Sequence, residues 1–329
     1  MAANDGAACY LNCEPNKAFK GIQPLKSPDC NPRKRGAAFK LSLTLILALT
    51  FMACALMLTG CGGEDRNKVV VSGSTTLLPI SEVAAQQFED ANPHYIVLVS
   101  GMGTSAGIEA VGVSGTADVG TSSRDLRGTE LELGLIEIPV AYDGIAVIVN
   151  PNNPINDLTL DEVRDIFAGN VTNWSELGGA DLPIVIVNRD EASGTRSSFA
   201  SAVMGDELFE VNSVVLPGTG QVREVVARTP EAIGYISVGF VEPRHVSTIV
   251  KPLSLNGVEP TDENIIDGTY PIARALHFLT NGVPEGSPLE YIEFVLSDRV
   301  QQGAVIDAGF LPITEADHAE FRRMLDEGQ

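Results

Sequence analysis

Cysteine is absent from this chain after position 61, because all five cysteines fall at or before that residue. A domain built from the later residues therefore has no disulfide, even in an oxidising compartment, and rests on its hydrophobic core. The roughly 260 residues that follow are enough for such a core, and their length suits two lobes.

Basic residues are also scarce, with 22 Lys and Arg against 43 Asp and Glu. Residues 1–60 hold seven of the basic and three of the acidic residues, so the remainder carries a net charge of about −25. This charge excludes nucleic acid and anionic membrane surfaces as partners. An anionic ligand is still possible, because screening by physiological salt limits the reach of exposed charges to about 8 Å.

Signatures of catalysis, metal binding and nucleotide binding are missing. No serine lies in a nucleophile elbow, and the four histidines, His94, His245, His277 and His318, lack metal-ligand spacing. Residues 101–107 fit a dinucleotide loop only loosely, since no suitable acidic residue follows. The sequence therefore predicts a protein that is not an enzyme and uses no metal or cofactor.

The first sixty residues differ in kind from the rest. A basic cluster at 33–35 precedes the apolar run 41–58, which ends before Cys61. This order is typical of a secretory signal, and the cysteine favours a lipoprotein signal with Cys61 as lipid-bearing first residue and 61–68 as tether. An uncleaved membrane helix is the alternative. Both alternatives predict that the main body of the protein lies outside the cytoplasm. Residues 1–32 are expected either to be disordered or to be included only because the start codon was misassigned.

Three later turns carry glycine and hydroxyl residues between a predicted strand and a predicted helix. They lie at 72–76, 100–108 and 188–196. Such turns direct backbone N–H groups and the positive end of a helix dipole at one spot, and Arg189 adds a planar cation that binds two oxygens at once. Together they favour a site for a small oxyanion, although each turn alone is consistent with a capped helix.

Predicted strands and helices alternate through the later residues, which favours an α/β fold with parallel strands. We expect strands at 69–71, 95–99, 138–149, 184–187, 213–216 and 233–236, and another ending at Phe278. We expect helices at 77–90, 105–113, 159–167, 195–204, 221–228, 289–296 and 314–325.

Six motifs in this order resemble the phosphate-binding proteins of ABC importers, a branch of the type II periplasmic binding proteins. They lie at 73–76, 101–107, 117–124, 142–147, 189–196 and 232–235, and the resemblance spans about 69–329. It implies two α/β lobes joined by two crossing segments, with the ligand in the cleft between them. We place the outer lobe at 69–142 plus 248–329 and the central lobe at 143–247.

The resemblance also implies the residues that contact phosphate. By position they are Thr75, Ser105, Arg189, Ser193, Gly194 and Thr195, with Ser74 and Thr76 as less favoured neighbours. Members of the family carry an Asp where this chain has Ser123, which we include in the site. That carboxylate accepts the proton of hydrogen phosphate and so rejects sulfate.

Asp143 is the replacement we expect for this proton acceptor, because it lies on an apolar strand at the predicted hinge. A hinge-capping role that uses only backbone contacts is the alternative. Arg124, beside Ser123, is expected either to supply a second cation or to orient Asp143.

The expected function is therefore extracytoplasmic binding of inorganic phosphate and its delivery to the transmembrane subunits of an ABC permease, with the membrane reached through the N-terminal lipid. The alternatives are a binding protein for sulfate, molybdate or tungstate, a surface protein that binds phosphate for signalling or adhesion, and a phosphoryl hydrolase.

Overall fold

The computed structural model describes residues 67–241 and 249–327. The contacts of the chain separate it at Gly63/Glu64, and all the described residues belong to the second unit, Glu64–Gln329. Four hydrophobic clusters lie entirely within the second unit, so this unit has its own cores and is expected to fold without the residues before it. The expected signal, Cys61 and His245 fall outside the described residues.

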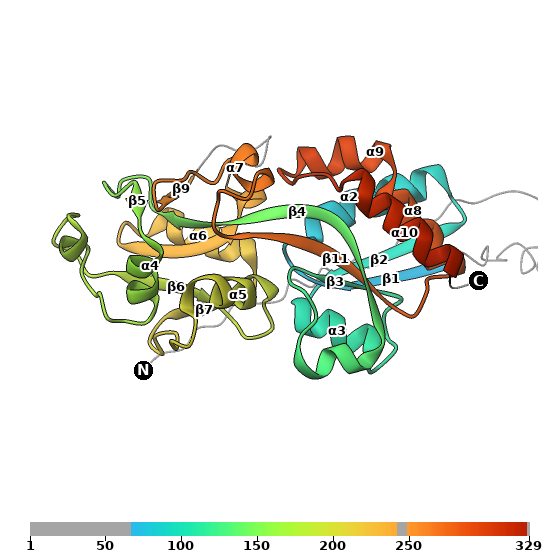
Figure 1. The fold of residues 1–329 in the computed structure, drawn as a ribbon, viewed down its shortest axis with the longest axis horizontal. Coiled ribbons are helices and arrows are strands. Elements are labelled where there is room, and N and C mark those ends of the chain that lie inside the picture. Colours follow the sequence, from blue (N-terminus) through green and yellow to red (C-terminus); the bar gives the residue numbers. More distant parts are fainter. Residues whose placement is uncertain (1–66, 242–248, 328–329) are drawn as a thin grey trace, which may run out of the picture. The chain divides into compact units, whose positions relative to one another are not determined.

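The strands of the second unit form two sheets that share one long strand (Figure 1). The first sheet has the order β2-β1-β3-β11-β4 and the second β4-β8-β6-β7, with β9 beside β4 and a separate β10-β5 pair. Their bounds are β1 Asn67–Gly73, β2 Tyr95–Gly101, β3 Val119–Ser122, β4 Leu135–Val149, β5 Asp157–Leu158, β6 Val185–Arg189, β7 Val214–Leu216, β8 Ala232–Ser237, β9 Lys251–Pro252, β10 Ser254–Leu255 and β11 Ala273–Asn281.

Within each sheet, the strands that lead into the three motif-bearing turns run parallel. β1 pairs parallel with β2 and β3, and β6 pairs parallel with β7 and β8, whereas β11 is antiparallel to β3 and β4. The carboxyl ends of parallel strands meet at one edge of a sheet, which is where ligands bind in open α/β sheets.

Helices cover both faces of each sheet. The α-helices are α2 Leu78–Ala91, α3 Thr104–Gly112, α4 Leu160–Phe167, α5 Gly194–Phe199, α6 Thr219–Arg228, α7 Asp262–Ile266, α8 Gly286–Leu296, α9 Asp298–Val300 and α10 Glu315–Glu327. Short 3-10 helices lie at Gly128–Leu133, Trp174–Leu177 and Val238–Phe240, and π-helical turns at Ala200–Met204 and Gln301–Val305.

Alternate residues of a strand point to opposite faces, so β11 contributes to two cores. Phe278 packs in a cluster with α2 and α8, while Leu279 packs with Ile108 of α3. The second sheet follows the same rule, because Val147 packs with α4 and α5 and Ile148 with α6.

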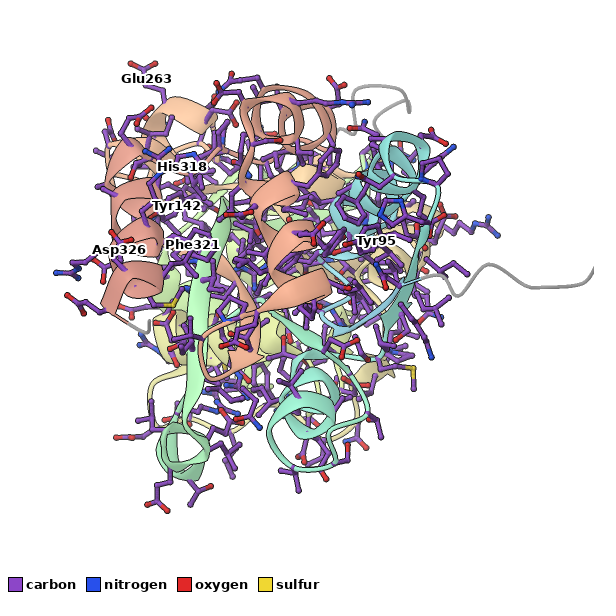
Figure 2. All side chains as sticks on the ribbon, turned by 90° about the vertical axis from the view of Figure 1, so that its right-hand side faces the viewer. Tyr95, Tyr142, Glu263, His318, Phe321 and Asp326 are labelled. Atoms are coloured by element: carbon purple, nitrogen blue, oxygen red, sulfur yellow. The ribbon has the colours of Figure 1, made fainter. Side chains whose placement is uncertain are left out.

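α10 packs on the first sheet near its shared strand. Phe321 is the buried residue of this helix, and Figure 2 labels it together with Tyr142 of β4. The hydroxyl of Tyr142 donates a hydrogen bond to Asp317 at 3.0 Å. Burial, together with this carboxylate, raises the pKa of Tyr142 to about 12. The phenol therefore remains a hydrogen-bond donor at neutral pH.

Two adjacent strand segments connect the two sheets. β4 pairs with β11 up to Gly144 and with β8 from Ile145 onward. On the return path Ala273 pairs with Gly144, and the carbonyl of Ile272 accepts from the N–H of Ile145 at 2.9 Å.

The return crossing differs from the expected boundary at 248. Leu253, Leu255, Ile265 and Tyr270 pack in the hydrophobic cluster of the second sheet. The chain therefore crosses back at Ile272, because the apolar residues before it are buried against the second sheet.

Among residues 67–241 and 249–327, no helix combines the length and the apolar character needed to cross a membrane.

Candidate functional site

Three strand-to-helix turns bring their threonines together. Thr76, just before α2, lies with its Oγ1 3.1 Å from that of Thr195 in α5 and 3.4 Å from that of Thr219 in α6. Thr75 Oγ1 lies 3.2 Å from Thr219 Oγ1. These contacts join the first sheet to the second, since α2 follows β1 and α5 and α6 follow β6 and β7.

Two further hydroxyls, those of Thr104 and Ser123, lie beside these threonines. Thr104, the first residue of α3, has its Oγ1 3.3 Å from Ser123 Oγ and accepts the backbone N–H of Ser123 at 3.1 Å. A Cβ built on Gly194 would lie 2.4 Å from Thr104 Oγ1 and 2.6 Å from Ser123 Oγ. Only glycine leaves room for this approach. We call the six side chains the hydroxyl cluster: Thr75, Thr76, Thr104, Ser123, Thr195 and Thr219.

Arg189 contacts this cluster from the end of β6. Its Nη1 donates to Thr219 Oγ1 at 3.1 Å and its Nη2 to Thr75 Oγ1 at 3.2 Å. The residue is 2% exposed, and its Nε and Nη2 also donate to the carbonyls of Leu216 and Pro217. Burial lowers the pKa of Arg189, but a guanidinium keeps its proton in proteins, so the cluster contains a fixed positive charge.

Arg274 supplies a second buried guanidinium, from β11. Its Nη1 donates to Thr195 Oγ1 at 3.1 Å and to the carbonyl of Ser123 at 2.9 Å. Its side chain is 6% exposed. Burial lowers the pKa of Arg274, while the carboxylate of Asp143 raises it. The hydroxyl cluster is thus bounded by two cations, one from each sheet.

Asp143 has partners other than those expected of a proton acceptor. Its Oδ2 accepts from Nε and Nη2 of Arg274 at 3.1 and 2.7 Å, and its Oδ1 accepts from Ser237 Oγ at 2.7 Å. Burial raises the pKa of Asp143 above its ordinary value, although Arg274 and Ser237 act in the opposite direction; the assignment as counter-ion rests on the two contacts with Arg274. The carboxylate is therefore the counter-ion that orients Arg274, and the guanidinium stands between it and Thr195.

Arg124 does not provide the second cation. It forms a bidentate ion pair with Glu130 at 2.6 and 2.8 Å and donates to the carbonyl of Asp125 at 2.9 Å. It therefore fixes the loop after β3 and does not contact Asp143.

The remaining sequence candidates serve the backbone near the cluster. Ser193 Oγ caps α5 by accepting from the N–H of Arg196 at 3.1 Å, and Ser74 Oγ accepts from the N–H of Thr76 at 3.1 Å. The N–H of Ser105 donates to the carbonyl of Ala192 at 3.1 Å. The hydroxyl that α3 brings into the cluster is that of the preceding Thr104.

Sequence reasoning misses part of the cluster. The site expected from the sequence contains Ser105 in place of its neighbour Thr104, and it does not include Thr219. Arg274 was not singled out, although a lone arginine within the apolar segment 273–279 is a signal that could have found it. A buried arginine on an apolar strand needs a counter-ion, which points to a polar site.

The chemistry of the cluster suits a tetrahedral oxyanion. Hydroxyls pair with one another as donor and acceptor, but each can instead donate to an anion, and the two guanidinium groups add charge-assisted donors. The first turns of α2, α3, α5 and α6 add backbone N–H groups and the positive ends of the helix dipoles.

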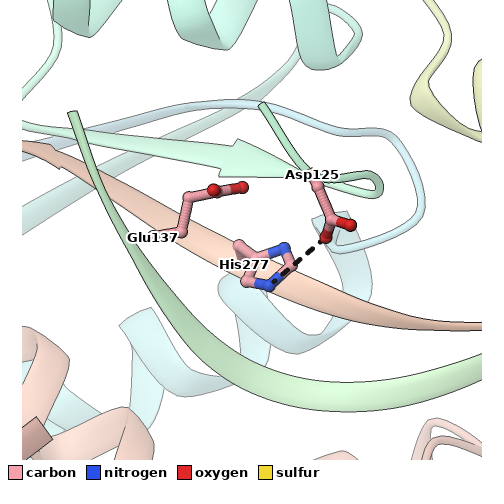
Figure 3. Close-up of side chains that lie close together, drawn as sticks. All are labelled: Asp125, Glu137 and His277. Atoms are coloured by element: carbon pink, nitrogen blue, oxygen red, sulfur yellow. Dashed lines mark ion pairs between the residues drawn. The ribbon is translucent and has the colours of Figure 1, made fainter. Parts of the chain in front are cut away.

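A separate group outside the hydroxyl cluster combines two carboxylates and an imidazole. Potential ligand atoms of Asp125, Glu137 and His277 lie within 4.8 Å of one another (Figure 3).

Comparison with known proteins identifies the family. The PBP superfamily domain matches residues 62–299. The phosphate-binding protein PstS of Bacillus subtilis is 30% identical over 290 residues, which cover 82% of this chain and 94% of that protein. The chain belongs to the PstS family of phosphate-binding proteins. PstS of Borreliella burgdorferi is 31% identical over 82% of this chain and 98% of its own length.

Solved structures related to the PstS family share this fold. A putative phosphate ABC transporter substrate-binding protein of Clostridium perfringens, solved with bound phosphate, is 37% identical and superposes with a TM-score of 0.70 over 75% of this chain and 100% of that chain. An ABC-type phosphate transport receptor of Vibrio cholerae is 31% identical, with a TM-score of 0.62 over 74% of this chain and 100% of that chain. These structures confirm the expected type II periplasmic binding protein fold.

Proposed function

We propose that this protein binds inorganic phosphate outside the cytoplasm and delivers it to an ABC permease. Membership of the PstS family supports the transport role, since the relatives are named as phosphate-binding proteins and the Clostridium structure holds phosphate. The observation that carries the proposal for this chain is the set of contacts by which Arg189 and Arg274 meet hydroxyls from both sheets.

Phosphate would replace the hydroxyl–hydroxyl contacts of the cluster. The ligand roles expected from the sequence would be kept by Thr75, Ser123, Arg189, Gly194 and Thr195. The set would be completed by Thr76, Thr104, Thr219 and Arg274. The turns around the ligand would be held in place by Ser74, Ser105 and Ser193, whose own hydroxyls would not contact phosphate. Asp143 would orient Arg274 and make no contact with the ligand.

The number of donors is sufficient for tight binding. Micromolar affinity requires about 8 kcal/mol, and a hydrogen bond to a charged partner contributes about 1.5–3 kcal/mol. Two guanidinium groups and a few hydroxyls can therefore supply a gross interaction free energy of this size. No general base, nucleophile or metal is needed for this role.

Isothermal titration of residues 62–329 with phosphate, arsenate and sulfate tests the proposal. We expect saturable phosphate binding that Arg189→Ala weakens at least tenfold, because that substitution removes a buried charged donor worth more than about 1.4 kcal/mol. Arg228→Ala is the matched control, since its side chain is 81% exposed at the end of α6. Sulfate binding without phosphate binding would favour the oxyanion alternative, and absence of binding to all three anions would contradict the proposal.

We further propose that Cys61 carries the lipid that anchors the protein to the outer side of the cell membrane. The order of basic residues, apolar run and cysteine supports this, as does the polar segment that follows. Labelling cells with a radioactive fatty acid tests it. The wild-type protein should incorporate the label and Cys61→Ser should not, whereas equal labelling of both would contradict the assignment.

A further inference from the structure

Asp125, Glu137 and His277 come from three segments that the fold holds side by side. Asp125 lies in the loop after β3, Glu137 on β4 and His277 on β11. None of the three is assigned to the oxyanion. Figure 3 shows the two carboxylates and the imidazole gathered in one place, and their potential ligand atoms all lie within 4.8 Å of one another.

Strand register explains why these side chains share one face of the first sheet. His277 pairs with Pro139 on β4 and with Ser122 on β3. Glu137 is two residues before Pro139, so its side chain points to the same face as that of Pro139. Asp125 follows shortly after Ser122 in the adjacent loop. Two of the three groups therefore stand on neighbouring strands, which limits their movement.

The imidazole of His277 is buried without a full set of partners. The residue is 6% exposed, and its Nδ1 is a buried atom with no hydrogen-bond partner. Its Nε2 lies 3.9 Å from Asp125 Oδ1, which is longer than a hydrogen bond. A buried polar nitrogen without a partner costs about 1–3 kcal/mol, so an unpaired imidazole facing two carboxylates calls for a ligand.

The two carboxylates differ in a way that suits entry and retention of an ion. Glu137 Oε1 accepts the N–H of Leu126 at 2.8 Å, which fixes the carboxylate in place. Asp125 is exposed, with 84% of its side chain accessible, so it reaches solvent and can swing toward an arriving ion. The Arg124–Glu130 ion pair anchors the loop from which Asp125 projects.

We propose that Asp125, Glu137 and His277 bind a divalent first-row transition-metal ion, with Zn²⁺ as the best match. One imidazole nitrogen and two carboxylate oxygens form a mixed nitrogen and oxygen set, which zinc accepts, whereas Mg²⁺ and Ca²⁺ prefer oxygen alone. Water would fill the remaining position. The ion would tie the loop after β3 to β4 and β11. The three ligands lie far apart in the sequence, between 125 and 277, so the spacing between histidines does not indicate this metal site.

Titration of residues 62–329 with ZnCl₂ in phosphate-free buffer tests this proposal. The segment contains no cysteine, so histidines and carboxylates are the only side chains that compete for zinc. The variants are His277→Gln and Asp125→Asn, with His94→Gln as matched control because His94 is exposed. Asp125→Asn alters an exposed side chain, so it keeps the test valid if His277→Gln impairs folding. Circular dichroism checks the fold of each variant.

We expect one equivalent of zinc to bind, at least about tenfold more weakly in His277→Gln and in Asp125→Asn, and within about twofold of wild type in His94→Gln. Magnesium should not bind at the same concentrations. Absence of saturable zinc binding below about 1 mM, unchanged binding in folded Asp125→Asn, or equally tight magnesium binding would overturn the proposal. Phosphate affinity is measured separately, so failure here leaves the phosphate proposal intact.

Discussion

At the scale of single residues, we expect both stability and phosphate binding to depend on the buried ion pair of Arg274 and Asp143. Removing one member of a buried ion pair costs about 3–5 kcal/mol, because the other charge is left without a partner. We predict that Arg274→Met lowers the free energy of unfolding by about 3 kcal/mol or more and weakens phosphate binding at least tenfold. Urea denaturation and titration calorimetry measure the two effects.

The double variant Arg274→Met with Asp143→Leu separates these effects. Replacing both charges by apolar side chains is often close to neutral for stability. We expect the double variant to recover most of the unfolding free energy while phosphate binding stays weak. Recovery of phosphate affinity together with stability would show that Arg274 supports the fold and does not contact the ligand.

Asp143→Asn tests whether Asp143 reads the proton of the ligand. Both carboxylate oxygens already accept from Arg274 and Ser237, so we predict that the ratio of phosphate to sulfate affinity changes by less than about twofold. Stability should fall, because a neutral amide no longer compensates the buried positive charge of Arg274. Calorimetric titration of the variant with both anions gives the ratio, and a large loss of phosphate preference would restore Asp143 as proton acceptor.

At the scale of helices and strands, the N-terminus of α5 depends on a missing side chain. We predict that Gly194→Ala weakens phosphate binding at least tenfold, because its methyl group would displace the hydroxyls of Thr104 and Ser123. Gly220→Ala is the matched control: it lies in the first turn of α6 with nothing within 4 Å of the added carbon. The control should bind phosphate like wild type. Equal affinities in both variants would exclude the α5 turn from the site.

The sequence predicted most elements because their patterns are local. The helix expected at 159–167 is present as α4. A capping box of Thr159 and Glu162 opens it, and Gly169 after it has a positive φ of 80°. The expected helix at 195–204 is present as α5 and the π-helical turn Ala200–Met204. Local composition was sufficient in each case.

The features that escaped prediction depend on partners far away in the chain. Thr104 and Ser105 are adjacent hydroxyls, and only the direction of the first turn of α3 decides which one meets Ser123. Arg274 acquires its role from Asp143 and Thr195, which lie on other strands and helices. The return crossing was set too early because 249–272 contains only two-residue strands and a five-residue helix, which carry no periodic signal.

At the scale of the whole molecule, a chain with a formal charge of −21 is proposed to bind an anion. The long-range electrostatic field of the acidic residues opposes the approach of phosphate. The buried guanidinium groups and the helix N-termini attract phosphate only at short range. Salt shortens the Debye length from about 10 Å at 0.1 M to about 3 Å at 1 M, so it screens the exposed acidic residues far more than the buried site.

We therefore predict that phosphate affinity stays constant or rises by less than about threefold between 0.05 and 0.5 M NaCl. Calorimetric titrations of residues 62–329 at several salt concentrations measure this trend, with potassium gluconate in place of NaCl as the control for competition by chloride. A site made of exposed basic residues would instead lose affinity steeply as salt rises. A tenfold loss in both salts would mean that phosphate is held at the surface, outside the hydroxyl cluster.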